Sequence, residues 1–550
     1  MAFIFKAPHI GHLHSLVVAD IYARYAKLSK PDRPVYFVNG TDEHGLKIQN
    51  AAKAQGMDPS EFCDQLSVHF RKELNARNLI YKGRHEGWYS ISDETFYPAS
   101  QVTKQEQDGI EFYISTTSGS RVEWQEEENY KFRLSMFQSS LISHYTAHPN
   151  AIQPPQFQSD IMNALQEPLD DLSISRKRSR LSWGIPVPDD PDHTIYVWID
   201  ALTTYLSSVG YPWSATGGDG HSSGWPPDIQ VIGKDILRFH AIYFPAMLQA
   251  LDLPLAKQLL THSHWTVERA KMSKSIGNVA DPIQAIDKYG VDLVRYYLAR
   301  VGGRFRDDVD WSQEQLQKHS KEVISLLGNL FLRTTSPKIM ARVESVPRPS
   351  AADVTDTGTV ALSPLLNVLK RLAPTFDQHM QRFQVADAME SIIIALSEAN
   401  LLMTLAAPWS KDTPPAVAAN IQALMFETLR QCGILLQPVM PEKSTLLLES
   451  LGVSVGQRTL ADAAFGRPGL GERGYAQYST LSDDVTMRSQ VESFAAESEA
   501  AYGPRTGVPG RQPNVFKFRL KFLLYRMPSC RRQTALHDGE PLVTDATNLL

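Results

Sequence analysis

The sequence predicts an α/β fold in which a parallel sheet is split by an inserted module and followed by a bundle of helices. Short apolar runs alternate with helical stripes in two separate parts of the chain, and this alternation is typical of parallel sheets. Between the two parts, Tyr, Trp, Thr and Glu alternate, as in antiparallel strands. From about residue 311 to residue 451, helical stripes follow one another without strand signals, which predicts a helical bundle.

The individual elements follow from these patterns in chain order. A one-sided apolar stripe predicts a first helix from about His12. In the inserted module, alternating side chains predict strands at 87–91 and 111–114. A helix is expected at about 236–251. The buried strands of the two sheet parts are expected at 35–39, 195–198, 229–232 and 258–261.

Composition limits the class of protein. The chain has 550 residues, 43% of them hydrophobic, enough for roughly three to four domains with real cores. A net charge of −5 argues against non-specific coating of nucleic acid, but it leaves room for a local basic surface that binds one. The longest apolar run, 391–409, contains Glu398 and Asn400 and is too polar for a membrane span. We therefore expect no membrane association.

The three cysteines are Cys63, Cys432 and Cys530, which lie far apart in the sequence. They form neither a disulfide framework nor the paired spacing of a zinc knuckle. We therefore expect a reducing compartment and no structural zinc. The first residues show neither a charged and then apolar signal nor an Arg/Ser-rich amphipathic helix, so no targeting segment can be read there.

Two histidines flank a glycine where the first helix begins, in the order His9-Ile10-Gly11-His12. A helix N-terminus offers unpaired N–H groups and partial positive charge to an anion such as phosphate. Gly11 lets a flat base or a ribose approach the backbone, and the two imidazoles can donate hydrogen bonds to phosphoryl oxygens. The pattern fits a nucleotide site. For an isolated motif, ordinary helix residues or metal ligands are an equally good interpretation.

A second segment, Lys271-Met272-Ser273-Lys274-Ser275, consists of small, polar and cationic residues and is predicted to be a mobile loop. Two ammonium groups three residues apart can hold a pyrophosphate leaving group. A flexible loop can make these contacts mainly in the transition state, where they raise the rate. Taken alone, a solvated basic loop is the more common interpretation.

Together, the HxGH segment and a KMSKS loop about 260 residues later resemble the paired signatures of the class I aminoacyl-tRNA synthetases. These enzymes activate an amino acid with ATP and load it onto tRNA. From about residue 3 to residue 451 the chain resembles one family of this class, the methionyl-tRNA synthetases. The segments that carry the resemblance are GTDEHGLKI at 40–48, GWYSISDE at 87–94, EEENY at 126–130, YVWIDA at 196–201 and IGKDI at 232–236.

The resemblance implies a methionine–tRNA ligase that uses ATP with Mg²⁺ and acts on methionine and tRNA(Met). It implies that four catalytic residues position and stabilise charge without a dedicated base, namely His9, His12, Lys271 and Lys274. It also places Asp235 at the ribose hydroxyls, whereas a helix N-cap is that residue's structural alternative. The full set implied to bind ATP is His9, Gly11, His12, Gly233, Asp235, Lys271, Met272, Ser273, Lys274 and Ser275.

The resemblance also implies a binding pocket for methionine. A fixed carboxylate suits the ammonium group, and the resemblance gives this role to Asp42. An aromatic-rich wall suits a thioether, and the implied wall residues are Phe3, Trp198, Ala201, Tyr205, Ile236 and His240. Trp198, Ala201 and Tyr205 would share one face of a helix. Taken singly, each aromatic is more often a core residue.

Trp409 matches the family's tryptophan that stacks on an anticodon base, with Ser325 and Asn329 expected to face the same region. A core tryptophan is the alternative.

The resemblance also implies the domain organisation: a Rossmann-like catalytic domain split by a connective domain without zinc, then an all-α anticodon-binding bundle. The expected bounds are 1–83 and 169–300 for the catalytic domain, 84–168 for the insert, 301–320 for a stem-contact linker, 321–455 for the bundle and 456–550 for a poorly ordered tail.

Few residues precede His9, so the first strand of the family's sheet is expected to be missing. The insert has no cysteine and is similar to the zinc-free bacterial and mitochondrial type. A monomer in the mitochondrial matrix is therefore expected, with the cytoplasm as the alternative.

Other enzymes of the class are less consistent with the sequence. A leucine, isoleucine or valine enzyme would need a larger editing insertion, and a cysteine enzyme would need zinc-binding thiols. A catalytically impaired tRNA-binding homologue is the remaining alternative.

Overall fold

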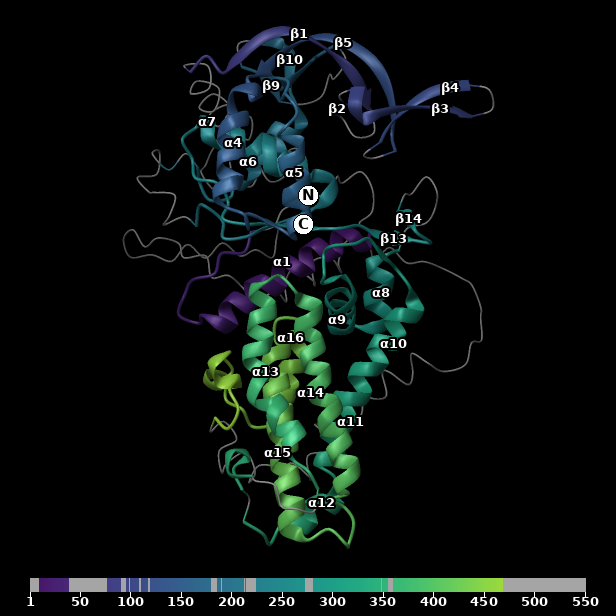
Figure 1. Cartoon of the computed structure of the whole chain (residues 1–550), viewed down its shortest axis with the longest axis vertical. Helices are drawn as coiled ribbons and strands as arrows, with labels where there is room; N and C mark the ends of the chain where they lie inside the picture. The colour runs from purple at the N-terminus through teal and green to yellow at the C-terminus, as the bar shows by residue number, and fades with distance from the viewer. Residues whose placement is uncertain are drawn as a thin grey trace, which may run out of the picture.

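An antiparallel sheet lies at one end of the molecule and a helical bundle at the other, with helix α1 (Ile10–Ser29) between them (Figure 1). The computed structural model describes residues 9–38, 77–90, 95–97, 99–107, 110–116, 119–179, 185–188, 190–211, 213, 224–272, 280–347, 349–354 and 360–467.

A parallel sheet lies beside α1. Within the described residues it has three strands, in the order β11 (Gln230–Gly233), β12 (Leu259–His262) and β6 (Ile152–Gln153). Every residue of β12 is buried, as expected for a parallel strand covered on both faces. The predicted α/β class with a parallel sheet is confirmed.

Helices and short turns surround this sheet. Between β11 and β12 the chain forms a 3-10 turn at Lys234–Ile236, a π-helical turn at Phe239–Tyr243 and helix α7 at Phe244–Ala250. A second small sheet joins β13 to β14 and to β15. The remaining elements here are α4 (Gln138–Ala147), α5 (Pro155–Ala164), α6 (Val197–Ser207), β13 (Trp265–Val267), β14 (Ala270–Lys271), α8 (Pro282–Tyr289), α9 (Val291–Gly302) and β15 (Val309–Asp310).

Two predicted strands are wrong. Residues 35–38, the described part of the strand predicted at 35–39, form no strand, and Tyr36 is 56% exposed. The strand predicted at 195–198 ends at Ile195, because β10 (Asp190–Ile195) is antiparallel to its neighbours and α6 begins at Val197. A short apolar run of this kind does not distinguish a strand from a buried helical segment.

The inserted module is a curved sheet whose strands pair in the order β2-β1-β5-β4-β3, all antiparallel. Its limits differ from residues 84 and 168. The sheet starts at Ile80 and β7 joins it after residue 168, whereas β6 belongs to the parallel sheet. The strands of this sheet are β1 (Ile80–Ser90), β2 (Thr95–Tyr97), β3 (Val102–Gln107), β4 (Ile110–Ser115), β5 (Arg121–Phe132) and β7 (Leu172–Ser173). A separate antiparallel sheet has the order β8 (Ser175–Lys177), β10 and β9 (Pro186–Val187).

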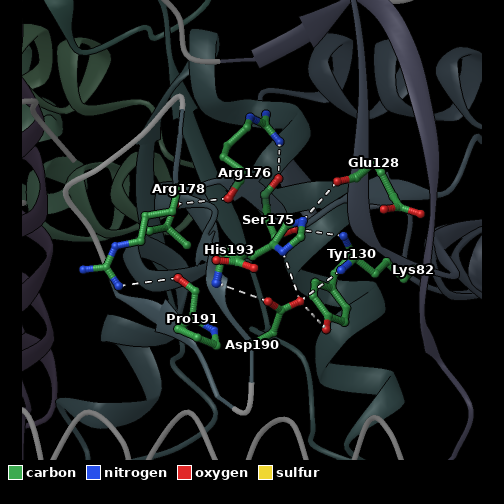
Figure 2. Close-up of polar contacts among 11 residues, drawn as sticks. Lys82, Glu128, Tyr130, Ser175, Arg176, Arg178, Asp190, Pro191 and His193 are labelled. Atoms are coloured by element: carbon green, nitrogen blue, oxygen red, sulfur yellow. Dashed lines mark hydrogen bonds and ion pairs between the residues drawn. The ribbon is translucent and has the colours of Figure 1, made fainter.

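A polar cluster around Asp190 fastens this sheet to the segment that leads into α6 (Figure 2). The Asp190 carboxylate accepts hydrogen bonds from Lys82 Nζ at 3.1 Å and Tyr130 Oη at 2.9 Å. His193 Nδ1 lies 3.0 Å from the same carboxylate, and His193 Nε2 lies 3.1 Å from the carbonyl oxygen of Glu128. These contacts join β1 and β5 to β10, the strand that ends just before α6.

The bundle follows the β15 strand, and its helices share one hydrophobic core with α1 and α9. Tyr25 of α1 donates a hydrogen bond to the Asp377 carboxylate of α13, which fixes α1 to the bundle. The predicted helical region is therefore confirmed. Its helices are α10 (Gln313–Val323), α11 (Asn329–Thr334), α12 (Pro337–Val343), α13 (Ser363–Gln381), α14 (Val385–Ala406), α15 (Pro415–Leu436) and α16 (Pro441–Ser450).

Of the helices in the described residues, α14 alone is long and apolar enough to cross a membrane by length and composition. Half of its most apolar window is buried within the structure, as is common for the core helix of a bundle. It packs against α9, α13 and α15.

Residues 456–467, assigned by the sequence to the tail, lie against α15. The buried guanidinium of Arg430 donates hydrogen bonds to the carbonyl oxygens of Asp462 and Ala464, the second at 2.9 Å. The N–H of Leu460 donates to the carbonyl oxygen of Leu28 in α1 at 2.9 Å. This segment therefore joins the end of α1 to the bundle, and residues 468–550 lie outside the described part of the chain.

Candidate active site

The two histidines of the HxGH segment cap the N-terminus of α1. His9 is the N-cap residue, and its Nδ1 accepts a hydrogen bond from the N–H of Gly11 at 3.0 Å. In return, His12 Nδ1 accepts from the N–H of His9 at 3.2 Å. The two rings stack with their centroids 3.8 Å apart. The motif thus orders the start of the helix and brings both imidazoles to its positive end.

These hydrogen bonds decide where the protons of the rings lie. Each Nδ1 accepts a backbone hydrogen bond, so the proton of each neutral ring is on Nε2. Burial and the neighbouring His9 lower the pKa of His12 to about 4, so this ring is neutral at pH 7. His12 Nε2–H is then a fixed donor that an anion at the helix end can use.

At two glycines of the predicted ATP site, a Cβ would meet a neighbouring side chain at less than 3 Å. A Cβ on Gly11 would lie 2.8 Å from His9 Cε1. A Cβ on Gly233, at the end of β11, would lie 2.7 Å from Asp235 Oδ1. Both atoms belong to predicted ligand-binding side chains, so a larger residue at either glycine would have to displace His9 or Asp235.

The residue that follows the lysine loop, Ala280, contacts the start of the histidine helix. The N–H of Ile10, at the start of α1, donates to the carbonyl oxygen of Ala280 at 3.2 Å. Ala280 is the first described residue after the loop. Before the loop, β14 pairs the backbone of Lys271 with Thr266, and Met272 is buried in the core. The Lys271 side chain, Ser273, Lys274 and Ser275 lie outside the described part of the structure.

Two site residues that the sequence did not reveal fix α1 to the carboxyl end of β12. Ser15 Oγ lies 2.6 Å from His262 Nε2, and His262 Nδ1 lies 2.9 Å from the carbonyl oxygen of Ser263. Burial lowers the pKa of His262 to about 4, so at pH 7 its neutral Nε2 accepts from the serine. The only available sequence signal was that Ser15 lies four residues after Gly11, on the same helix face.

The predicted methionine-pocket residues come together between α6 and the turn after β11. Trp198, Ala201 and Ile236 are buried in one hydrophobic cluster. Tyr205 Oη lies 2.9 Å from His240 Nε2, and His240 Nδ1 lies 2.9 Å from the carbonyl oxygen of Ile236. These bonds hold the imidazole and the phenol in one orientation.

Phe239, which the sequence did not single out, stacks on Trp198 with ring centroids 4.0 Å apart. This contact extends the aromatic wall beyond the predicted set. Phe3 and Asp42, the two remaining predicted methionine ligands, lie outside the described residues.

Burial lowers the pKa of His240 from its ordinary value of 6.5 to about 4, and this makes stability depend on pH. The unfolded chain binds the proton more tightly, so the contribution of His240 to stability is lost as the pH falls from about 6.5 towards 4. Between pH 7 and pH 5 the loss is about 2 kcal/mol for such a group. We expect the melting temperature of His240→Gln to fall less over this interval than that of the wild type.

The exposed His148 provides the matched control, because His148→Gln should keep the wild-type pH dependence of melting. Equal falls for the wild type and His240→Gln would contradict the explanation based on His240.

Of the three residues expected to bind the anticodon, Trp409 lies beside Arg333, which is on the same run of helix as the other two. Trp409 is 38% exposed and follows Ala407, which ends α14 in the left-handed conformation with φ +42°. The guanidinium of Arg333 lies 5.1 Å over the indole ring of Trp409. Asn329 lies with Arg333 on α11, and Ser325 lies in the π-helical turn Ile324–Gly328 just before it; both Asn329 and Ser325 are exposed.

Arg333 was missed in the sequence, although it lies four residues after Asn329 and therefore on the same helix face. It adds a cation to an exposed aromatic surface, a combination suited to a nucleobase beside its phosphate. Since Trp409 is more than a third exposed, the structure does not favour the alternative of a core tryptophan.

Within the described residues, no group of three or more His, Cys, Asp or Glu side chains could hold a metal ion. Cys432, the one cysteine in the described part of the chain, is a free thiol buried in the bundle core.

Comparison with known families agrees with this geometry. The family model of class I tRNA synthetases of the methionine type, "tRNA synthetases class I (M)", matches residues 1–73 and 65–335. The fold and the site thus define a class I tRNA synthetase. The relatives described next narrow this class to a single family.

A probable mitochondrial methionine–tRNA ligase of Neurospora crassa is 39% identical over 510 residues, which is 84% of this chain and 81% of the relative. The mitochondrial methionine–tRNA ligase of Homo sapiens is 37% identical, covering 84% of each chain. The Mycobacterium tuberculosis methionyl-tRNA synthetase bound by methionyl-adenylate superposes with a TM-score of 0.72 at 32% identity, over 86% of this chain and 98% of that one. The chain belongs to the methionyl-tRNA synthetase family.

Proposed function

We propose that the chain is a methionine–tRNA ligase. A carboxylate oxygen of methionine attacks the α-phosphorus of ATP, the bond to the β-phosphate breaks, and pyrophosphate leaves. A hydroxyl of the terminal tRNA ribose then attacks the carbonyl carbon of methionyl-adenylate, and AMP leaves. Both steps transfer a group to an oxygen nucleophile, so positioning and charge stabilisation carry the catalysis.

One observation carries this proposal more than any other. The hydrogen bond from Ile10 to Ala280 joins the start of the histidine helix to the end of the lysine loop. The two motifs are about 260 residues apart in sequence. In this proposal both border one site at the carboxyl end of the parallel sheet, where nucleotides bind in open α/β folds.

In the proposed site, His9 and His12 donate Nε2–H to phosphate oxygens, and Lys271 and Lys274 hold the departing pyrophosphate. Asp235 accepts hydrogen bonds from the ribose hydroxyls. Gly11 and Gly233 support this arrangement, because a Cβ at either position would displace His9 or Asp235. ATP enters with Mg²⁺, which neutralises part of the phosphate charge.

The amino acid lies against the wall formed by α6 and the turn after β11, with Asp42 pairing with its ammonium group. Support comes from the stacked pair of Trp198 and Phe239, which offers a polarizable surface to a thioether. The fixed pair of Tyr205 and His240 gives the wall a rigid shape. Phe3, Ala201 and Ile236 complete the apolar lining in this proposal.

ATP–pyrophosphate exchange tests the proposal. Labelled pyrophosphate should enter ATP in the presence of methionine and not in the presence of leucine, isoleucine, valine or cysteine. Exchange with another of these amino acids at a comparable rate would overturn the specificity. A protein that binds tRNA without exchanging with any amino acid would be the catalytically impaired homologue.

The surface of Trp409, Arg333, Asn329 and Ser325 is proposed to bind the anticodon of tRNA(Met). Trp409→Ala should raise the KM for tRNA in aminoacylation by about tenfold, because stacking on one base contributes roughly 1–3 kcal/mol. Methionine-dependent exchange should stay close to wild type, since Trp409 lies at the far end of the bundle from α1. The variant Val455→Ala, at a side chain that is 80% exposed, is the matched control.

A loss of exchange together with a lower melting temperature would make Trp409 a structural residue. An unchanged KM for tRNA would remove it from the proposed anticodon surface.

The names of the relatives point to mitochondria, and we propose the mitochondrial matrix as the compartment of this chain. A monomer without structural zinc is the proposed state. Sedimentation of the purified protein and metal analysis after chelation test these two points.

A further inference from the structure

Two segments of the candidate site are held together by one carboxylate, that of Asp308. Its Oδ1 accepts hydrogen bonds from Lys234 Nζ at 2.6 Å and from the N–H of His264 at 2.9 Å. Burial alone would raise the pKa of Asp308, but these hydrogen bonds outweigh it and lower the pKa, so the group stays ionised. The turn that carries Asp235 is therefore fixed to the loop after β12.

This arrangement places the imidazole of His264 beside Asp235. His264 Nε2 lies 3.5 Å from Asp235 Oδ1, and Nε2 is buried without a hydrogen-bond partner among the described residues. The side chain of Asp235 is 50% exposed, whereas that of His264 is 21% exposed. The carboxylate can thus meet a ligand from solvent while the histidine contacts it from inside the protein.

We propose that His264 is a positioning residue for the nucleotide, acting through Asp235. This inference rests on the proposed function, in which Asp235 accepts the ribose hydroxyls of ATP. His264 Nε2–H donates to one carboxylate oxygen and holds the carboxylate in the rotamer that receives the ribose. The contact tightens when the nucleotide binds, because hydrogen bonds in unliganded sites are often long.

In this proposal His264 acts through its side chain, because its backbone N–H already donates to Asp308. Its effect should therefore appear in nucleotide binding and depend on the ribose hydroxyls, while the phosphate chemistry is unchanged.

The test compares the wild type and one variant, His264→Leu, each with two nucleotides. Methionine-dependent pyrophosphate exchange by the full chain is measured in all four cases. His264→Leu should raise the KM for ATP about tenfold with kcat within about twofold of wild type, at the low end for a hydrogen bond to a charged group. With 2′,3′-dideoxy-ATP, which has no ribose hydroxyls, kcat/KM should be the same for the wild type and the variant within about twofold.

His264→Gln retains an N–H donor at a similar reach and should recover most of the affinity for ATP. His148→Ala, at an exposed histidine, should leave both nucleotides unaffected. Melting temperatures show whether each variant is folded. If His264→Leu does not fold, His264→Ser takes its place in the same comparison, because its short side chain also lacks a donor that reaches Asp235, and it should again weaken only the use of ATP.

Equal losses with ATP and with the dideoxy nucleotide would overturn the inference, since His264 would then act on the fold or on the phosphates. A loss confined to kcat would overturn it as well. These results would leave the proposed function intact, whereas a wild-type protein without methionine-dependent exchange would overturn both.

Discussion

His12→Ala should lower the kcat of methionine-dependent pyrophosphate exchange by about 10²–10³-fold, while the affinity for methionine changes little. Removing one preorganised donor to developing charge has an effect of this size. His12 provides such a donor because its Nδ1 is occupied by the His9 N–H and its pKa is lowered to about 4 by burial. Exchange rates at saturating methionine and ATP measure the effect.

The variant His12→Asn distinguishes the role of His12 Nε2–H as a donor from the role of His12 in capping α1. The asparagine Oδ1 can still accept the hydrogen bond from the His9 N–H, but its amide does not reach the position of Nε2. Both variants should therefore be slow. If only the alanine variant were slow, capping of α1 would explain the effect, and His12 would not act on the phosphate.

Glu427→Ala should lower the free energy of unfolding by about 3–5 kcal/mol, because it leaves the guanidinium of Arg430 buried without its carboxylate. The pair is bidentate, with Arg430 Nε and Nη2 each 2.7 Å from a different oxygen of Glu427. The side chain of Arg430 is fully buried. The Glu427 carboxylate also accepts from the N–H of Gly466 at 3.1 Å, so the segment after α16 should loosen too.

Urea unfolding followed by circular dichroism measures this loss. Glu111→Ala provides the control, because Glu111 pairs with Lys104 at the surface and such a pair contributes about 1 kcal/mol or less. The double variant Glu427→Leu with Arg430→Met should be more stable than Glu427→Ala, since no charge remains buried. A loss below about 1 kcal/mol in Glu427→Ala would contradict a buried pair.

The periodicity of apolar residues was sufficient to predict helices and strands where a segment is long or strongly patterned. It placed the helical bundle, the strands near 230 and 260 and the antiparallel strands of the insert close to their positions. It failed at 195–198 and at 35–38, where four or five apolar residues fit a strand and a helix or loop equally well. Periodicity also did not predict the limits of the insert, because these depend on the pairing of β6 with β12 and of β7 with β5, which are distant in the sequence.

For the site, the sequence could identify residues whose spacing is itself informative. Trp198, Ala201 and Tyr205 at helical spacing do lie on α6, with Trp198 and Ala201 buried. Contacts between distant segments could not be read from spacing. The pairing of Ser15 with His262 and the position of Arg333 over Trp409 became visible only in three dimensions.

The most direct test of the account is charging of tRNA(Met) with labelled methionine by the full chain. We expect methionine to become acid-precipitable on tRNA(Met) in the presence of ATP and Mg²⁺, with no charging when leucine replaces methionine. Charging should require both ATP and an intact anticodon. Failure to attach methionine, or equal attachment of leucine, under conditions in which the protein is folded would contradict the assignment.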